Sequence, residues 1–240
     1  MKLTKISAAV LSASMLFVAT SASAADEAFT TAGSVAMTSD YLYRGISQTS
    51  GAPALQGSLT VSHESGLYAT VWGSSIAFSS GLELDPSIGF AGKSGDISYD
   101  VGVLYYGYPN STDDEVTNGS GKYDFVEFYG SVSYGGGKLG LAYADDFFGE
   151  TGNSIYVYGA YAKEVSGFGL SAQVGLSLLD DEFYGPALSL GEDSYIDYKV
   201  GVSKAVQGVT LELAYMGSDL DDAIVPDGEG TFVLTASKSF

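Results

Sequence analysis

Charged side chains recur at every second position within several apolar stretches of this chain. Glu83 and Asp85 are two residues apart, as are Asp197 and Lys199. Further acids of the same kind are Asp100, Glu127 and Glu212. Carboxylates that face a water-filled passage attract cations and repel anions, whereas carboxylates paired with bases can plug a narrow interior. These residues are therefore expected to act through charge, as the lining of a pore or as its plug, with Lys199 as the main opposing charge.

A second group of candidate residues lies closer to the N-terminus, at Asp40, Tyr41, Tyr43 and Arg44. Arg44 could fold into the mouth of a channel, pair with carboxylates there and stack on Tyr41 or Tyr43, which would constrict the passage. Alternatively, Arg44 could fix its own loop through a local ion pair, with Gly45 allowing a tight bend. Neither interpretation involves catalysis.

Other chemistry finds little support in the sequence. The chain has one histidine, His63, and no cysteine, and no Gly-x-Ser-x-Gly motif or metal-type pair of histidines occurs. We therefore predict no enzyme activity, no cofactor and no metal site. Acids in the predicted loops could bridge Ca²⁺ or Mg²⁺ to lipopolysaccharide or could simply be solvated. The formal net charge of −19 argues against nucleic acid as a partner.

The elements that would position these residues are strands, because side chains in a strand point alternately to opposite faces. Between residues 96 and 105, one face carries Ile97, Tyr99, Val101, Val103 and Tyr105. Similar runs begin near residues 29, 54, 67, 82, 123, 138, 154, 168, 195, 209 and 230. Gly, Ser, Ala and Thr dominate the opposite face. This pattern predicts about twelve strands with a small, polar inner face, although a half-exposed sheet of a soluble β-sandwich would also alternate.

The connections between these runs alternate in length and charge. Short Gly-containing links are predicted at residues 63–66, 93–96, 135–138, 163–167 and 204–208. Longer links at residues 40–52, 78–81, 107–121, 145–153, 179–193 and 217–230 hold 17 of the 29 acids. Short turns on one side and long loops on the other are typical of a bacterial outer-membrane barrel. We therefore predict an all-β, transmembrane, antiparallel up-and-down β-barrel, with the acidic loops outside and both ends in the periplasm.

The two ends of the chain carry export signals. Lys2 and Lys5 precede an uncharged core and the small-residue cleavage signal Ala22-Ser23-Ala24, which predicts a signal peptide over residues 1–24 and a barrel domain over residues 25–240. A transmembrane anchor would need a longer apolar core. The terminal Phe240 resembles the signal that the outer-membrane barrel assembly machinery recognises, so we expect that machinery as a partner, together with outer-membrane lipid and lipopolysaccharide.

The run from Thr38 to Thr49, with Pro53 to Gly57, Ser65 to Tyr68 and Trp72 to Ser74, resembles the TorF family of proposed porins. This is a conserved proteobacterial outer-membrane barrel family of unknown function. The resemblance is specific over about residues 34–74 and architectural beyond them. It implies an outer-membrane barrel with a channel or export role, and it brings no established catalytic residues.

Two functional hypotheses follow from these patterns. The first is an outer-membrane porin or channel that passes small solutes or ions, preferentially cationic or neutral ones, because the inward acids outnumber the bases. The second is a closed barrel without transport activity that uses its acidic loops for adhesion or ion bridging. Twelve strands lie between the filled eight-stranded barrels and the open channels of sixteen or more, so the strand number allows both.

Overall fold

The computed structural model describes residues 28–109, 111, 122–180, 184–185, 188–189, 193–220 and 230–240. The predicted signal peptide lies outside the described residues, as do the loop acids at positions 113–115, 181–182 and 221–222. The described residues include no helix long and apolar enough to cross a membrane.

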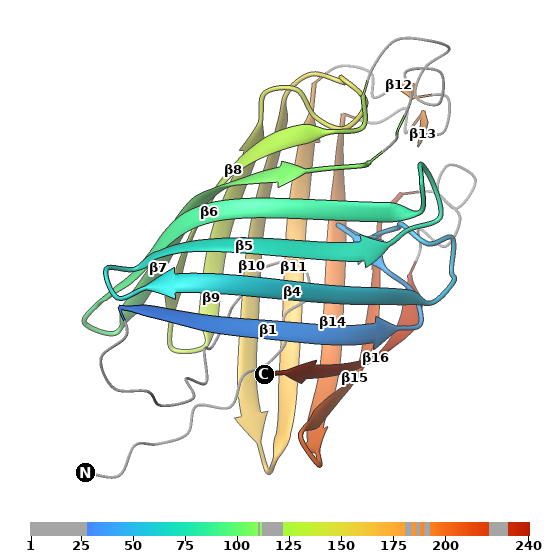
Figure 1. Ribbon diagram of the computed structural model, residues 1–240. Helices are drawn as coiled ribbons and strands as arrows, with labels where there is room; N and C mark the ends of the chain where they lie inside the picture. The colour runs from blue at the N-terminus through green and yellow to red at the C-terminus, as the bar shows by residue number, and fades with distance from the viewer. Residues whose placement is uncertain are drawn as a thin grey trace, which may run out of the picture.

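Twelve strands of the described chain form one closed antiparallel barrel (Figure 1). Each strand pairs with the strands before and after it in the ring, and the ring closes where β1 pairs with both β4 and β16. The strands are β1 (Phe29–Thr38), β4 (Ala54–His63), β5 (Leu67–Ser75), β6 (Leu82–Ser94), β7 (Ile97–Tyr106), β8 (Phe125–Tyr134), β9 (Gly137–Ala144), β10 (Ser154–Val165), β11 (Phe168–Leu179), β14 (Ser194–Val206), β15 (Val209–Ser218) and β16 (Thr231–Ser239). The predicted up-and-down barrel is therefore confirmed.

The outer face of the barrel is apolar, as the alternation predicts. Val101, Val174 and Leu213 are each about half exposed although they lie in the middle of paired strands. Such a surface is unfavourable in water and is stabilised where the surroundings are equally apolar. The closed ring also leaves no unpaired edge strand, which a bilayer requires because its core offers no hydrogen-bond partners. The barrel is that of a membrane-embedded protein.

The two ends of the barrel differ in their connections. At one end, which we call the turn end, links of two or three residues join β4 to β5, β6 to β7, β8 to β9, β10 to β11 and β14 to β15. At the other, the loop end, the connections run from six to eighteen residues. The predicted short and long links are thus confirmed. Phe240 lies at the turn end, where its backbone exchanges hydrogen bonds of 2.9 and 3.0 Å with Gly33 on β1.

The interior becomes less accessible from the turn end to the loop end. On β7 the inward-facing residues change from exposed Ser98, through half-buried Asp100 and Leu104, to buried Tyr106. On β14 they change from exposed Ala205, through half-buried Ser203, to a run of buried residues. The barrel is therefore open to solvent at its turn end and filled at its loop end.

The filling at the loop end has two sources. One is a cluster of aromatic and aliphatic side chains from strand ends and loops, where small and polar residues were expected on the inner face. Its buried members are Ile76, Tyr106, Tyr108, Tyr123, Phe125, Ala144, Phe147, Tyr195 and Leu220. The other is the loop over residues 40–52, which forms a hairpin from β2 (Leu42–Tyr43) and β3 (Ile46–Ser47). A second pair of two-residue strands, β12 (Tyr184–Gly185) and β13 (Leu188–Ser189), lies in the loop after β11.

Candidate functional site: a plugged barrel interior

The hairpin over residues 40–52 is shaped by its own polar contacts. Asp40 Oδ1 accepts hydrogen bonds of 2.7 Å from the hydroxyls of Ser47 and Thr49, and Thr49 Oγ1 accepts one of 3.1 Å from the Tyr41 amide. These bonds join the two ends of the segment, so that it folds as one unit. Asp40 is therefore a residue that stabilises the loop.

The tip of the hairpin consists of Arg44 and Gly45, with positive φ angles of 45° and 82°. Two consecutive left-handed residues form the tight turn that matches the twist of a two-residue hairpin. A side chain at Gly45 would meet the carbonyl oxygen of Gly217 at 2.6 Å, so the tip lies against the end of β15. Arg44 is not a glycine, and its conformation is strained. The loop-end packing stabilises that strain and directs the side chain into the barrel.

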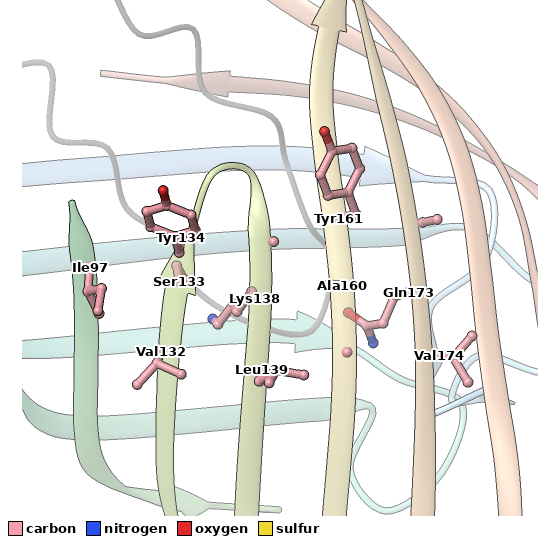
Figure 2. A pocket seen from close by; sticks show the side chains of 13 residues that line it. Ile97, Val132, Ser133, Tyr134, Lys138, Leu139, Ala160, Tyr161, Gln173 and Val174 are labelled. Carbon is pink, nitrogen blue, oxygen red and sulfur yellow. The ribbon is translucent and has the colours of Figure 1, made fainter.

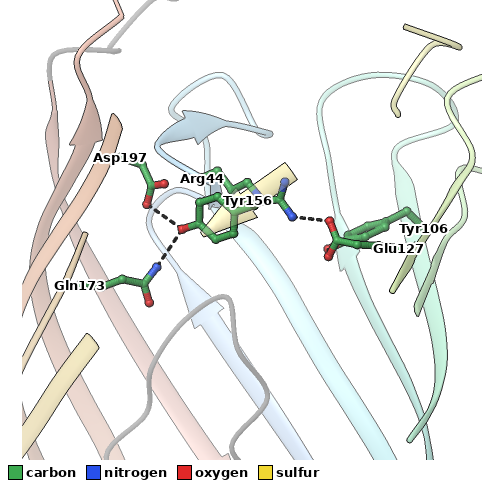
Figure 3. A network of polar contacts seen from close by, with 6 residues as sticks. All are labelled: Arg44, Tyr106, Glu127, Tyr156, Gln173 and Asp197. Carbon is green, nitrogen blue, oxygen red and sulfur yellow. Dashed lines mark hydrogen bonds and ion pairs between the residues drawn. The ribbon is translucent and has the colours of Figure 1, made fainter. Parts of the chain in front are cut away.

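Arg44 is buried inside the barrel, where its guanidinium donates a hydrogen bond to Glu127 on β8 and forms an ion pair with it (Figure 3). Its guanidinium carbon lies 4.8 Å from the centre of the Tyr43 ring and 4.2 Å from that of Tyr156 on β10. The side chain thus joins the loop to two distant strands. The predicted folding into the mouth, pairing with a lumen carboxylate and stacking on Tyr43 are observed. The ion pair is not local to the loop.

Tyr41 packs in a different place. Its ring makes an edge contact of 5.5 Å with Trp72 on β5, whereas no contact between Tyr41 and Arg44 is found in the described residues. Burial, followed by the charges of Glu83 and Asp85, raises the pKa of the Tyr41 hydroxyl well above its ordinary value. For Arg44, burial acts to lower the pKa, but the Glu127 carboxylate and nearby tyrosines outweigh it and hold that pKa well above its usual range. Both groups therefore keep their protons across the physiological range.

The predicted pore-lining residues all face the interior, but most lie in its filled half. Asp100 is half-buried near the turn end, where it accepts a hydrogen bond of 2.8 Å from Tyr68. The others are almost fully buried: Glu83, Asp85, Glu127, Asp197, Lys199 and Glu212. The structure therefore places these side chains on the inner face while burying them against other residues.

The buried charges are only partly paired. Lys199 donates a hydrogen bond of 2.9 Å to Glu212, and with Arg44–Glu127 this is one of two ion pairs in the described part of the chain. On β6, Glu83 accepts a bond of 3.2 Å from the Tyr108 hydroxyl and Asp85 one of 3.4 Å from the Gly107 amide. The nearly fully buried residues comprise six acids and three bases, so a negative excess lies inside the barrel.

Tyr156 on β10 connects Asp197 on β14 and Gln173 on β11 to Arg44 inside the barrel (Figure 3). Its hydroxyl donates to Asp197 Oδ1 at 3.1 Å and accepts from Gln173 Nε2 at 3.3 Å. Together with Arg44 and Glu127 this makes a chain of contacts across the interior, from β14 through β10 and the loop to β8. Neither Tyr156 nor Gln173 was among the predicted site residues. The alternation on β11 does place Gln173 on the inner face, opposite Leu170 and Val174, and Tyr156 occupies an inward position on β10.

The described residues contain no group of three or more His, Asp or Glu side chains placed to hold a metal ion. A hollow of about 570 Å³ lies beside the turn-end halves of β8 to β11 (Figure 2). Its lining includes Ile97, Val132, Tyr134, Leu139, Tyr161 and Val174, which are all exposed on the outer face. Lys138 and Gln173, which are buried on the inner face, also line this hollow, whereas none of the predicted pore-lining residues does.

A family model described as a bacterial protein of unknown function (Gcw_chp) matches residues 22–240, and no curated protein matches the sequence. The NanC porin has a similar structure, with a TM-score of 0.53 and 12% identity over 87% of this chain and 98% of that one. A structure from work on in-meso crystallization of membrane proteins has a TM-score of 0.53 and 10% identity, covering 88% and 83%. An outer membrane channel from Pseudomonas putida F1 has a TM-score of 0.49 and 13% identity, covering 88% and 95%. At these identities the likeness shows the fold alone.

Proposed function

The chain belongs to the bacterial family of unknown function Gcw_chp, and for this member we propose an outer-membrane channel that passes small solutes, preferentially cationic or neutral ones. The observation that carries the proposal is the interior. It is open at the turn end, lined by polar side chains in its middle, and filled at the loop end by the aromatic cluster and the hairpin over residues 40–52. A passage that is closed by a loop can open when the loop moves, whereas a barrel filled by its own strands cannot.

The preference for cations rests on the negative excess among the buried interior charges. If the hairpin leaves the mouth, Arg44 leaves with it, and the passage is lined by Glu83, Asp85, Glu127 and Asp197 together with the Lys199–Glu212 ion pair. A ring of carboxylates in a wet, narrow channel concentrates cations and excludes anions. The resemblance of residues 34–74 to the TorF family of proposed porins supports the same role. The alternation of short turns and acidic loops supports the outer membrane as the location, with the loop end outside.

Insertion of the purified protein into a planar bilayer tests the proposal. We expect stepwise currents whose reversal potential in a salt gradient shows a preference for cations. The same measurement on Arg44→Ala removes the contact that ties the hairpin to β8 and should increase the open time. Silence of both proteins over many insertions would reject the channel.

A closed barrel with a surface role is the second candidate, because the loop end is filled by a cluster of buried aromatic and aliphatic side chains, several of them on the strands. In that case the acidic loops would bind cations or a partner at the cell surface. Silence of the Arg44→Ala variant would favour this role, since that variant lacks the contact that we hold responsible for closure.

A further inference from the structure

A group of polar atoms on β10, β11 and β14 is buried without hydrogen-bond partners. Asp197 is 4% exposed and Gln173 is 6% exposed, and neither Asp197 Oδ2 nor Gln173 Oε1 has a partner in the described residues. Ser177 Oγ, two inward-facing positions beyond Gln173 on β11, is in the same condition. A buried acceptor without a donor is costly, and a carboxylate oxygen more so. Such atoms indicate a missing donor.

Asp197 and Gln173 are held close together by their hydrogen bonds to one tyrosine, Tyr156. Asp197 and Gln173 reach the same Tyr156 hydroxyl, from β14 and β11 respectively (Figure 3). Gly175 pairs with Tyr158 on β10 and with Asp197 on β14. A Cβ at Gly175 would overlap the Tyr156 hydroxyl and Asp197 Oδ2, so the unpartnered oxygen lies directly over this glycine. The glycine therefore permits the hydroxyl and the carboxylate to approach each other.

Of the three buried bases in the part of the chain that the structure describes, two have carboxylate partners, and the third, Lys138 on β9, lies over the Tyr158 ring. Lys199 donates to Glu212, and Arg44 donates to Glu127 while its guanidinium lies over the face of the Tyr156 ring. Asp197 forms no ion pair within the described residues. The charge of Asp197 is therefore left for a cation that comes from outside the chain.

Solvent approaches this group from the turn end. Ser171 on β11 and Ser203 on β14 are half-buried, and Gln173 and Lys199 form the first buried layer beyond them. A solute that enters the open half of the barrel meets Gln173 first and Asp197 next. Gln173 and Asp197 thus lie where the accessible part of the interior ends. They are next to Tyr156, whose ring contacts Arg44 of the hairpin.

We infer that Asp197, Gln173 and Tyr156 form a binding subsite for the ammonium group of a small cationic solute. An ammonium group has up to three N–H donors for the unpartnered carboxylate and amide oxygens. The set offers one carboxylate and no group of three acids, which suits a hydrogen-bonding organic cation better than a metal ion. The inference rests on the proposed channel and names the class of solute that it would take.

Unfolding of the purified barrel in detergent tests the subsite without any current. The heat-induced shift on gels would be followed in methylammonium, tetramethylammonium and sodium chloride at equal ionic strength and pH. Methylammonium should raise the unfolding midpoint of the wild type by about 2 °C or more over the other two salts. Tetramethylammonium has the same charge but no N–H donor.

Asp197→Asn should abolish this rise, because the amide keeps an acceptor for the Tyr156 hydroxyl but removes the charge. Glu64→Gln, which neutralises an exposed acid in the turn after β4, should keep it. Equal midpoints in the three salts, an equal rise in sodium, or a rise that persists in Asp197→Asn would each overturn the inference. Stabilisation of a barrel that conducts no current would reject the channel but keep the subsite, and conduction without stabilisation would reject the subsite alone.

Discussion

The Arg44 guanidinium is hydrogen-bonded to the Glu127 carboxylate inside the barrel, although the two residues are 83 positions apart in the sequence. This pair fixes the first loop to β8, and the Tyr106 hydroxyl adds a bond of 3.3 Å to the other Glu127 oxygen. Both side chains are almost fully buried. The hairpin over residues 40–52 is therefore held by an ion pair inside the barrel, where an unpaired charge is strongly unfavourable.

Removal of one partner of this pair should destabilise the barrel. We expect Arg44→Ala to lower the free energy of unfolding by about 3–5 kcal/mol, because it leaves Glu127 buried without its cation. The double variant Arg44→Ala with Glu127→Gln should lose less than the sum of the two single variants. Urea unfolding in micelles measures this double-mutant cycle. Additive losses would show that the pair is not coupled.

The second ion pair, Lys199–Glu212, joins β14 to β15 and allows the loss of a buried ion pair to be measured away from the hairpin. Lys199→Met should cost about 3–5 kcal/mol, since it strands a buried carboxylate, whereas replacement of both residues with Met and Leu should be nearly neutral. Neither change touches the hairpin over residues 40–52. Lys199→Met should therefore lower the free energy of unfolding without the increase in channel open time that we expect of Arg44→Ala in bilayers. An equal increase in open time in Lys199→Met would contradict the assignment of closure to Arg44.

The interior acids should set the ion selectivity. Asp100→Asn together with Glu212→Gln should shift the reversal potential in a salt gradient towards that of a nonselective pore, because the first removes a charge near the open turn end and the second removes a carboxylate deeper in the interior. Glu64→Gln, in the exposed turn after β4, is the matched control and should leave the potential unchanged. If the double variant kept the wild-type potential, the acids would not line the path of the ions.

The outer face should respond to charge according to depth. Val174→Arg, in the middle of β11, is expected to destabilise the folded barrel by about 2–4 kcal/mol, and Val206→Arg, at the turn end of β14, by about 1 kcal/mol or less. Both valines are exposed on the outer face. Heat-induced loss of the folded band on gels, or urea titration, would compare them. Equal effects would argue against a bilayer around the barrel.

The strands could be predicted from the sequence because strand parity is a local property. Every second residue of 82–90 and 97–105 is apolar, and a membrane barrel turns that alternation directly into an outside and an inside. Glu83, Asp85, Asp100, Glu127, Asp197, Lys199 and Glu212 were placed on the inner face by the same rule, and the structure places them there.

The filling of the loop end could not be predicted in this way. The path of a loop depends on distant partners, so nothing near Arg44 in the sequence identifies Glu127. The inward aromatic residues did leave a signal: Phe125 and Tyr129 have the parity of Glu127, and Tyr195 has that of Asp197. Parity alone does not identify them as a filling, because tyrosine is also expected in the aromatic belts of the outer face.

The central claim is that the hairpin over residues 40–52 closes the loop end and that the Arg44–Glu127 pair holds it there. The chain has no cysteine, so single cysteines can be placed at Ser74, buried in the loop half of β5, and at Ser98, exposed in the turn half of β7. A charged thiol reagent should label Ser98→Cys quickly and Ser74→Cys slowly. Adding Arg44→Ala should speed the labelling of Ser74→Cys by at least about tenfold, the change that a loss of about 1.4 kcal/mol in closing free energy produces, and leave Ser98→Cys unchanged. Labelling of Ser74→Cys at the same rate with and without Arg44 would contradict the claim.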